Sequence, residues 1–149
     1  MRLCVLPPEP GTVPIPPGHV RLYHQTTEAN LRSIEQHGLL YSHAKEIEGP
    51  RAIYACETPF YGDPTQTPTL EFHVPRDKEW WTTPCYVMQD VPVSNIIAAH
   101  YPWHSYARYI LSDPEVLQAT LRGENDDLWK ADRAYGPAVV YVKRLYCCR

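Results

Sequence analysis

The sequence predicts an α+β fold of short antiparallel strands in two packed sheets, with few helices. The chain has 149 residues and sixteen prolines, roughly double the average proline usage of about 5%. Prolines disfavour long helices and favour short strands and turns. Short segments with apolar residues at every second position recur along the chain, while helix signals are confined to a few places. The hydrophobic content of 44%, with eleven tyrosines, is enough to fill a core.

The first eighteen residues form a proline-rich segment, with Pro7, Pro8, Pro10, Pro14, Pro16 and Pro17. We expect residues 1–18 to be an extended arm, partly in the polyproline conformation, that packs along a single domain of residues 19–149. A ligand for a proline-recognising partner is the alternative reading of this arm.

The stretch after the arm predicts a strand, a corner and a helix. Residues 19–24 alternate as a strand does. Thr26 or Thr27 is a suitable N-cap for a helix from Glu28 to His37, and Gly38 is a suitable left-handed stop.

The remaining elements follow from the same signals. Further strands are expected at Arg51–Cys56, Thr69–Val74, Cys85–Met88, Asn95–His100 and Ala138–Val142. Residues 41–49 and 57–69 read as loops. Asp113 followed by proline predicts a helix that runs to Gly123, and a second short helix is expected over 126–135.

Composition bounds the classes of function. The formal net charge of −3 gives no case for broad nucleic-acid affinity, and no apolar run reaches membrane-spanning length. Residues 1–6 are too short for the apolar region of a signal peptide, so we expect a cytoplasmic protein.

The five cysteines fit neither a disulfide framework nor a zinc site, which favours reduced thiols. The histidines are too scattered for metal-ligand spacing, so no metal is predicted.

The chemistry-bearing feature is the corner at His24. A histidine at the end of a strand, followed two residues later by the hydroxyl of Thr26, is well placed to hold a small polar ligand.

Three segments in order carry a resemblance to a known family. They are Leu22-Tyr23-His24-Gln25-Thr26 with Asn30-Leu31 and Gly38-Leu39, then Ala52-Ile53-Tyr54-Ala55, then Leu70 to Pro75 with Cys85 to Ile97. Together they resemble the diphtheria-toxin-like ADP-ribosyltransferases, and most closely the members that are toxins modifying nucleic acid. The resemblance covers about residues 20–100.

The resemblance implies NAD as co-substrate. His24 would hydrogen-bond the adenosine-side ribose, with Thr26 beside it, and the backbone at Gln25 would hold the nicotinamide amide. Tyr54 would stack on the nicotinamide ring. The opposite wall of the site would come from Phe60 or Tyr61.

The third catalytic residue departs from the family pattern. Many members carry a glutamate shortly before the closing strand, but residues 81–84 contain no carboxylate. Glu71 and Gln89 are the candidates for this role, with Glu79 and Asp90 also close in sequence.

The resemblance therefore leaves three functions open. The first is an NAD-dependent mono-ADP-ribosyltransferase, a toxin or effector that modifies a nucleic acid or protein and is paired with an antitoxin or immunity protein. The second is an inactive module that binds NAD or ADP-ribose. The third, more distant, is an NAD-dependent RNA 2′-phosphotransferase, which would need clustered arginines, with Arg51 and Arg76 as candidates. No membrane partner is expected.

One further group of residues stands outside the resemblance. Tyr101, Tyr106, His100, Trp103 and His104 form an aromatic and histidine cluster. It reads as a packed loop, with base stacking as the functional alternative.

Overall fold

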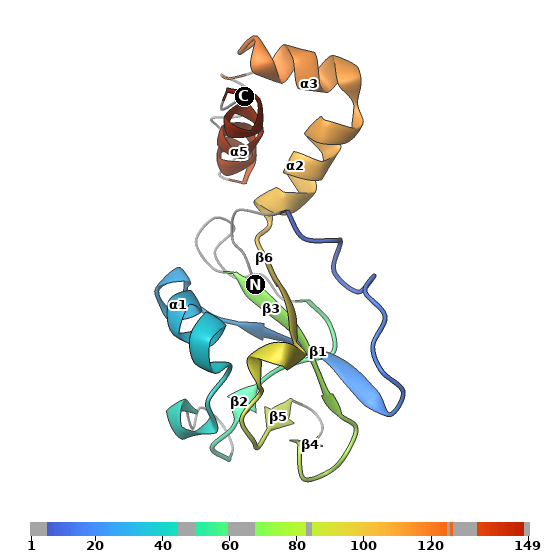
Figure 1. Ribbon diagram of the computed structural model, residues 1–149, viewed down its shortest axis with the longest axis vertical. Helices are drawn as coiled ribbons and strands as arrows, with labels where there is room; N and C mark the ends of the chain where they lie inside the picture. The colour runs from blue at the N-terminus through green and yellow to red at the C-terminus, as the bar shows by residue number, and fades with distance from the viewer. Residues whose placement is uncertain are drawn as a thin grey trace. The chain divides into compact units, whose positions relative to one another are not determined.

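The computed structural model describes residues 6–44, 50–59, 68–82, 85–124, 126 and 134–147. These residues form an α+β structure with two small antiparallel sheets (Figure 1). The chain divides into two compact units. The described residues up to His100 belong to the first and those from Tyr101 onward to the second. Residues 19–149, which we expected to form one domain, contain parts of both.

The first sheet is the centre of the first unit. Its strands are β1 (His19–Gln25), β3 (Thr69–Pro75) and β6 (Ile96–His100), in the order β1-β3-β6. All neighbours are antiparallel, and Leu22 lies opposite Phe72. The predicted strands at 19–24, 69–74 and 95–100 are confirmed to within a residue at each end, because period-two alternation over several residues is a strong signal.

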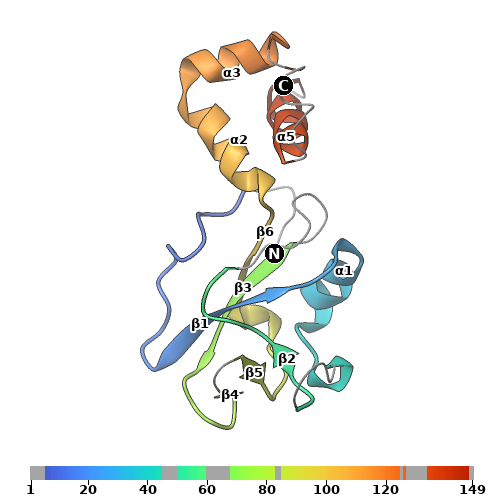
Figure 2. The same cartoon turned by 180° about the vertical axis from the view of Figure 1, so that it is seen from behind.

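The second sheet has much shorter strands, in the order β2-β5-β4 (Figure 2). They are β2 (Ile53–Tyr54), β5 (Tyr86–Val87) and β4 (Trp81–Thr82). The strands predicted at 51–56 and 85–88 therefore exist but are shorter, and β4 was not predicted. A bridge between Tyr23 and Cys56 links β1 to the residues after β2, so the two sheets meet at β1.

Helix α1 spans Glu28–His37, as predicted, and buries Leu31 and Ile34. Thr27 occupies the N-cap position but makes no side-chain capping bond. Gly38 ends the helix with a φ of 76°, and its N–H donates to the carbonyl of Ile34. A methyl group at Gly38 would lie 2.1 Å from the carbonyl oxygen of Val91, so both the backbone angle and the close approach require glycine there.

The first unit also contains two short 3₁₀ segments. One is η1 (Tyr41–His43), which follows α1, and the other is η2 (Val93–Asn95), which directly precedes β6. Between α1 and η1, Leu39 forms an antiparallel bridge with Val91. This bridge ties the residue after the helix stop to the segment that precedes η2.

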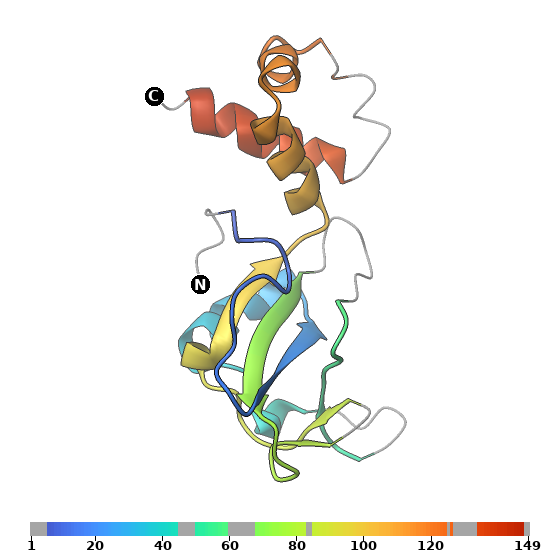
Figure 3. The same ribbon diagram turned by 90° about the vertical axis from the view of Figure 1, so that its right-hand side faces the viewer.

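The two faces of the first sheet differ in character. Leu22, Leu70, Phe72 and Val74 are each 0% exposed and form the core on the side where α1 lies. Residues 6–18 run along the other face as an extended arm without helix or strand (Figures 1 and 3). That face carries Arg21 and Glu71.

The second unit is helical over its described residues. Its helices are α2 (Trp103–Ser112), α3 (Pro114–Leu121) and α5 (Tyr135–Cys147). Asp113 caps α3, since its side chain accepts from the backbone N–H groups of Glu115 and Val116. The predicted start of this helix is thus confirmed. The predicted helix at 126–135 falls mostly outside the described residues.

The strand predicted at Ala138–Val142 is wrong, because these residues lie inside α5. The buried positions Ala138, Val139 and Val142 repeat at helical spacing, while Val140 is 49% exposed. A run of β-branched residues resembles a strand locally. Here packing of α5 against α2 decides the conformation instead.

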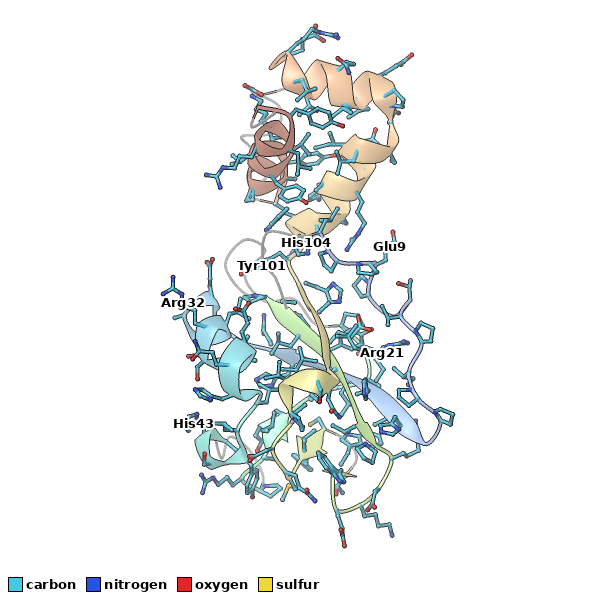
Figure 4. The ribbon with its side chains drawn as sticks, viewed as in Figure 1. Glu9, Arg21, Arg32, His43, Tyr101 and His104 are labelled. Atoms are coloured by element: carbon cyan, nitrogen blue, oxygen red, sulfur yellow. The ribbon has the colours of Figure 1, made fainter. Side chains whose placement is uncertain are left out.

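The aromatic and histidine cluster, read as a packed loop, is instead largely the start of α2. The ring of Trp103 contacts the rings of His104 and Tyr141 at centroid distances of 4.3 and 5.4 Å. Tyr106 stacks on Tyr135 at 3.9 Å. His104 is buried, and its Nδ1 accepts from the backbone N–H of Tyr101 (Figure 4). These rings serve as packing between α2 and α5.

Within the described ranges, no helix combines the length and the apolar character that crossing a membrane requires.

Candidate functional site

The candidate site is centred on the contact between His24, near the end of β1, and Tyr54 on β2 of the second sheet. His24 Nδ1 lies 2.6 Å from the backbone carbonyl oxygen of Tyr54. A carbonyl oxygen only accepts hydrogen bonds, so Nδ1 must carry the hydrogen. In the neutral ring, Nε2 is then an acceptor with a lone pair. The bond therefore fixes both the orientation and the tautomer of the imidazole.

The environment of His24 keeps its ring neutral. Burial lowers the pKa of His24 below its usual range, and the hydrogen bond to the Tyr54 carbonyl offsets this only in part. Burial acts in this direction because it penalises the charged imidazolium. At neutral pH the side chain presents an acceptor, which suits a hydroxyl donor.

Tyr54 is held on β2 by contacts at both ends of its side chain. Its hydroxyl donates to the carbonyl of Pro50 at 2.8 Å. Its ring meets that of Tyr86, its cross-strand partner, edge-on at a centroid distance of 5.5 Å. Cross-strand aromatic pairs of this kind fix ring positions and contribute about 0.5–1.5 kcal/mol. Tyr54 is half-buried, so part of its side chain stays accessible.

Backbone pairing holds the two residues that follow His24. Gln25 is the last residue of β1 and lies opposite Thr69. The N–H of Thr26 donates to the carbonyl of Pro68 at 3.1 Å, and Thr26 is 9% exposed. The structure thus brings His24 next to Tyr54, while Gln25 and Thr26 pair with Thr69 and Pro68. Phe60 and Tyr61 lie outside the described residues.

Glu71 lies on the opposite face of the first sheet. His24 is opposite Leu70 in the register, whereas Glu71 is opposite Tyr23, so the side chains of His24 and Glu71 point to different faces. The carboxylate of Glu71 is 1% exposed and sits beneath the arm. The structure therefore does not bring it together with His24.

The contacts of Glu71 define a buried polar cluster of Gly11, Arg21, Glu71 and His100. Glu71 Oε1 accepts from His100 Nε2 at 2.8 Å and from the backbone N–H of Gly11 at 3.2 Å. Glu71 Oε2 lies 3.1 Å from Arg21 Nε. Arg21 points from β1 toward the arm (Figure 4) and also donates to the carbonyl of Val13.

The cluster keeps Glu71 ionised. Burial by itself raises the pKa of Glu71, but the hydrogen bonds from His100 and Gly11 and the charges of His100 and Arg21 outweigh it and lower the pKa below its usual range. This cluster was not predicted from the sequence. The available signal was that Arg21, Glu71 and His100 fall on the same face once the three strands are aligned.

The other candidates for the third residue have separate contacts. Gln89 Nε2 donates to the backbone carbonyl of Glu79 at 3.0 Å. Asp90 Oδ1 accepts from the backbone N–H of Tyr41 at 2.7 Å, which ties the segment before Val91 to η1.

The two arginines considered for phosphate binding also have separate partners. Arg51 lies over the ring of Tyr41, 5.5 Å from its centroid. Arg76 lies over the ring of Trp81 at 5.7 Å and 3.7 Å from the carboxylate of Glu57. Across the described ranges, no three histidine, cysteine, aspartate or glutamate side chains are grouped so as to hold a metal ion.

Comparison of the chain with protein-family models, with curated proteins and with solved structures finds no match in any of the three.

Proposed function

We propose that the corner formed by His24, Gln25, Thr26 and Tyr54 binds NAD, and that the protein is an NAD-dependent mono-ADP-ribosyltransferase acting on a nucleic acid or protein. The observation that supports the proposal is the hydrogen bond between His24 and Tyr54, which are 30 positions apart in the sequence. Two of the residues that the resemblance assigns to NAD are therefore neighbours in space.

The chemistry of the corner suits this ligand. The lone pair on Nε2 of neutral His24 would accept a hydrogen bond from a ribose hydroxyl, and the aromatic face of Tyr54 would stack on the nicotinamide ring. In the transfer, the bond between nicotinamide and ribose breaks and nicotinamide leaves with the bonding electrons. A nucleophile of the acceptor then bonds to the ribose carbon and releases its proton to solvent.

A second candidate function is a module that binds NAD or ADP-ribose without turnover. The placement of Glu71 favours it, because this carboxylate lies on the face away from His24 and is held by His100 and Gly11. The phosphotransferase alternative gains nothing from the arginines, since Arg51 and Arg76 contact different aromatic side chains.

Two measurements on the full chain test the proposal. Calorimetry with NAD should give binding that His24→Ala weakens at least tenfold. His37→Ala should leave binding unchanged, because His37 is exposed at the end of α1. His24→Asn, which can still donate to the Tyr54 carbonyl, separates loss of the ligand contact from loss of folding.

Incubation with NAD labelled on the adenylate, together with nucleic acid and protein from a cell lysate, separates the two functions. Transfer of label that depends on His24 supports the transferase. Binding without transfer or nicotinamide release supports the module. If NAD neither binds nor is consumed, the site assignment is refuted.

A further inference from the structure

We propose that Cys56 and Cys85 form a reversible disulfide, which makes the end of β2 and the start of β5 an oxidation-sensitive site. The pair lies next to Tyr54, but its chemistry does not depend on NAD binding. Both thiols are free in the structure.

The backbone places the two cysteines just beyond the ends of two adjacent strands, Cys56 after β2 and Cys85 before β5. Ile53 is opposite Val87 and Tyr54 is opposite Tyr86, and the next pair is closed by a hydrogen bond of 3.0 Å from the N–H of Ala55 to the carbonyl of Cys85. Cys56 is therefore one residue beyond the position opposite Cys85. Cys56 and Cys85 both lie just outside the regular ladder, with their backbones side by side, and a disulfide there requires Cα atoms roughly 4.4–6.8 Å apart.

The side chains meet as well. Burial first, and then the neighbouring thiol of Cys56, raises the pKa of Cys85, so the two side chains interact. Cys56 is exposed, while Cys85 is half-buried. Oxidation begins at accessible thiolates, so Cys56 is the sulfur that an oxidant in solution meets first and Cys85 is the resolving thiol.

Hydrogen peroxide is an oxidant that can convert the two thiols to a disulfide in a balanced reaction. The Cys56 thiolate attacks one peroxide oxygen, the O–O bond breaks, and hydroxide leaves to give a sulfenic acid. The Cys85 sulfur then attacks the sulfur of Cys56, the S–S bond forms, the S–O bond breaks, and water leaves. Two thiols are oxidised and one peroxide is reduced to two waters, and a dithiol reductant reverses the reaction.

The disulfide would connect β5 to the place where β1 meets the end of β2. The N–H of Tyr23 donates to the carbonyl of Cys56 at 2.8 Å, and the N–H of Cys56 donates back at 3.0 Å. A disulfide from Cys56 to Cys85 would therefore tie β5 to the bridge between β1 and the end of β2. Tyr54 precedes this bridge by two residues, so oxidation would stiffen the strand that carries it.

The test uses the full chain with Cys4→Ser, Cys147→Ser and Cys148→Ser, which leaves only the pair. After treatment with one equivalent of peroxide, alkylation and digestion, mass spectrometry should find a peptide linked through Cys56 and Cys85 in monomeric protein. Both free thiols should be lost and should return with dithiothreitol. The unfolding temperature should rise by roughly 10 °C on oxidation, as expected for closing a loop of this length.

Two comparisons make the outcome decisive. Adding Cys85→Ser should remove the linked peptide and leave Cys56 as a sulfenic acid that dimedone traps. If both thiols stay open to alkylation, if they oxidise singly, or if the link joins two chains, the proposal is overturned. Peptide mapping of the unmodified chain repeats the test without any substitution.

Discussion

The buried cluster around Glu71 provides the sharpest test of the structure. The perturbation is Glu71→Gln, which keeps the shape of the side chain and removes its charge. The amide oxygen of glutamine can still accept from His100 and Gly11 as Oε1 does. Its NH₂ group must then replace Oε2, which lies 3.1 Å from Arg21 Nε. A donor would face a donor, and the guanidinium would lose its counter-charge.

The stability lost in Glu71→Gln follows from the burial of the ion pair. Removing one partner of a buried ion pair costs about 3–5 kcal/mol. The carboxylate is 1% exposed but the Arg21 side chain is 23% exposed, so water can partly solvate the remaining charge. We therefore expect a loss at the lower end, about 3 kcal/mol at neutral pH, equivalent to roughly hundredfold faster exchange of the most protected amides.

The pH dependence has a definite sign. Glu71 has a lowered pKa in the folded protein, so its stabilisation is present above the pKa of an unfolded glutamate and is lost as the pH falls through the lower, folded value. In acid the wild-type side chain is neutral, as glutamine is at every pH. The stability difference between the two proteins should therefore shrink toward zero as the solution is acidified.

The assay is hydrogen exchange at the amides of β1 and β3. These amides report on the first unit separately from helices α2, α3 and α5 of the second unit. Glu57→Gln is the matched control. Glu57 is 55% exposed beside Arg76, and the same substitution there should cost less than about 0.5 kcal/mol. A Glu71→Gln cost below about 1 kcal/mol, or a difference that does not change with pH, would refute this account of the cluster.

Three further predictions concern other sites. Gly38→Ala should destabilise the first unit by about 3 kcal/mol in urea unfolding, because the methyl group meets the Val91 carbonyl at a backbone angle that alanine disfavours; a neutral result would contradict the close approach. Asp113→Ala should lower the stability of α3 by about 1 kcal/mol in amide exchange, with Asp113→Asn nearly neutral; equal effects of the two would argue against the cap. NAD affinity should stay constant through neutral pH and fall only in acid below the ordinary histidine pKa, as His24 gains a proton and Nε2 loses its lone pair; a decline that begins above that pKa would contradict the lowered value.

The sequence predicted those elements whose signal is local. The strand at β1, the helix α1 with its stop at Gly38, and the start of α3 at Asp113 each have alternation, a left-handed glycine or a cap within a few residues. Residues 138–142 show where local signals fail. The same valine-rich run fits a strand or a buried helix face, and only its packing partner decides between them.

The candidate site also combines residues with a local sequence signal and residues placed by distant parts of the chain. The turn from β1 to α1 that carries His24, Gln25 and Thr26 could be predicted because these residues are consecutive, whereas Tyr54 reaches His24 from a strand 30 positions away. The cluster of Glu71 could not, because it needs the register of three strands and the position of the arm at the same time. Side-chain direction in a strand depends on a single residue of register, so sequence proximity alone could not show that Glu71 faces away from His24.

The pairing of β1 also constrains the order in which the protein can form during synthesis. β1 is complete at residue 25, but its antiparallel partner β3 begins at residue 69, and the strand on the far side of β3 ends at residue 100. Contacts this distant in sequence form slowly, and domains near the N-terminus fold as the chain emerges. The ribosome must therefore deliver two-thirds of the chain before Glu71 can meet both Gly11 and His100, and the first strand stays unpaired until β3 has been made.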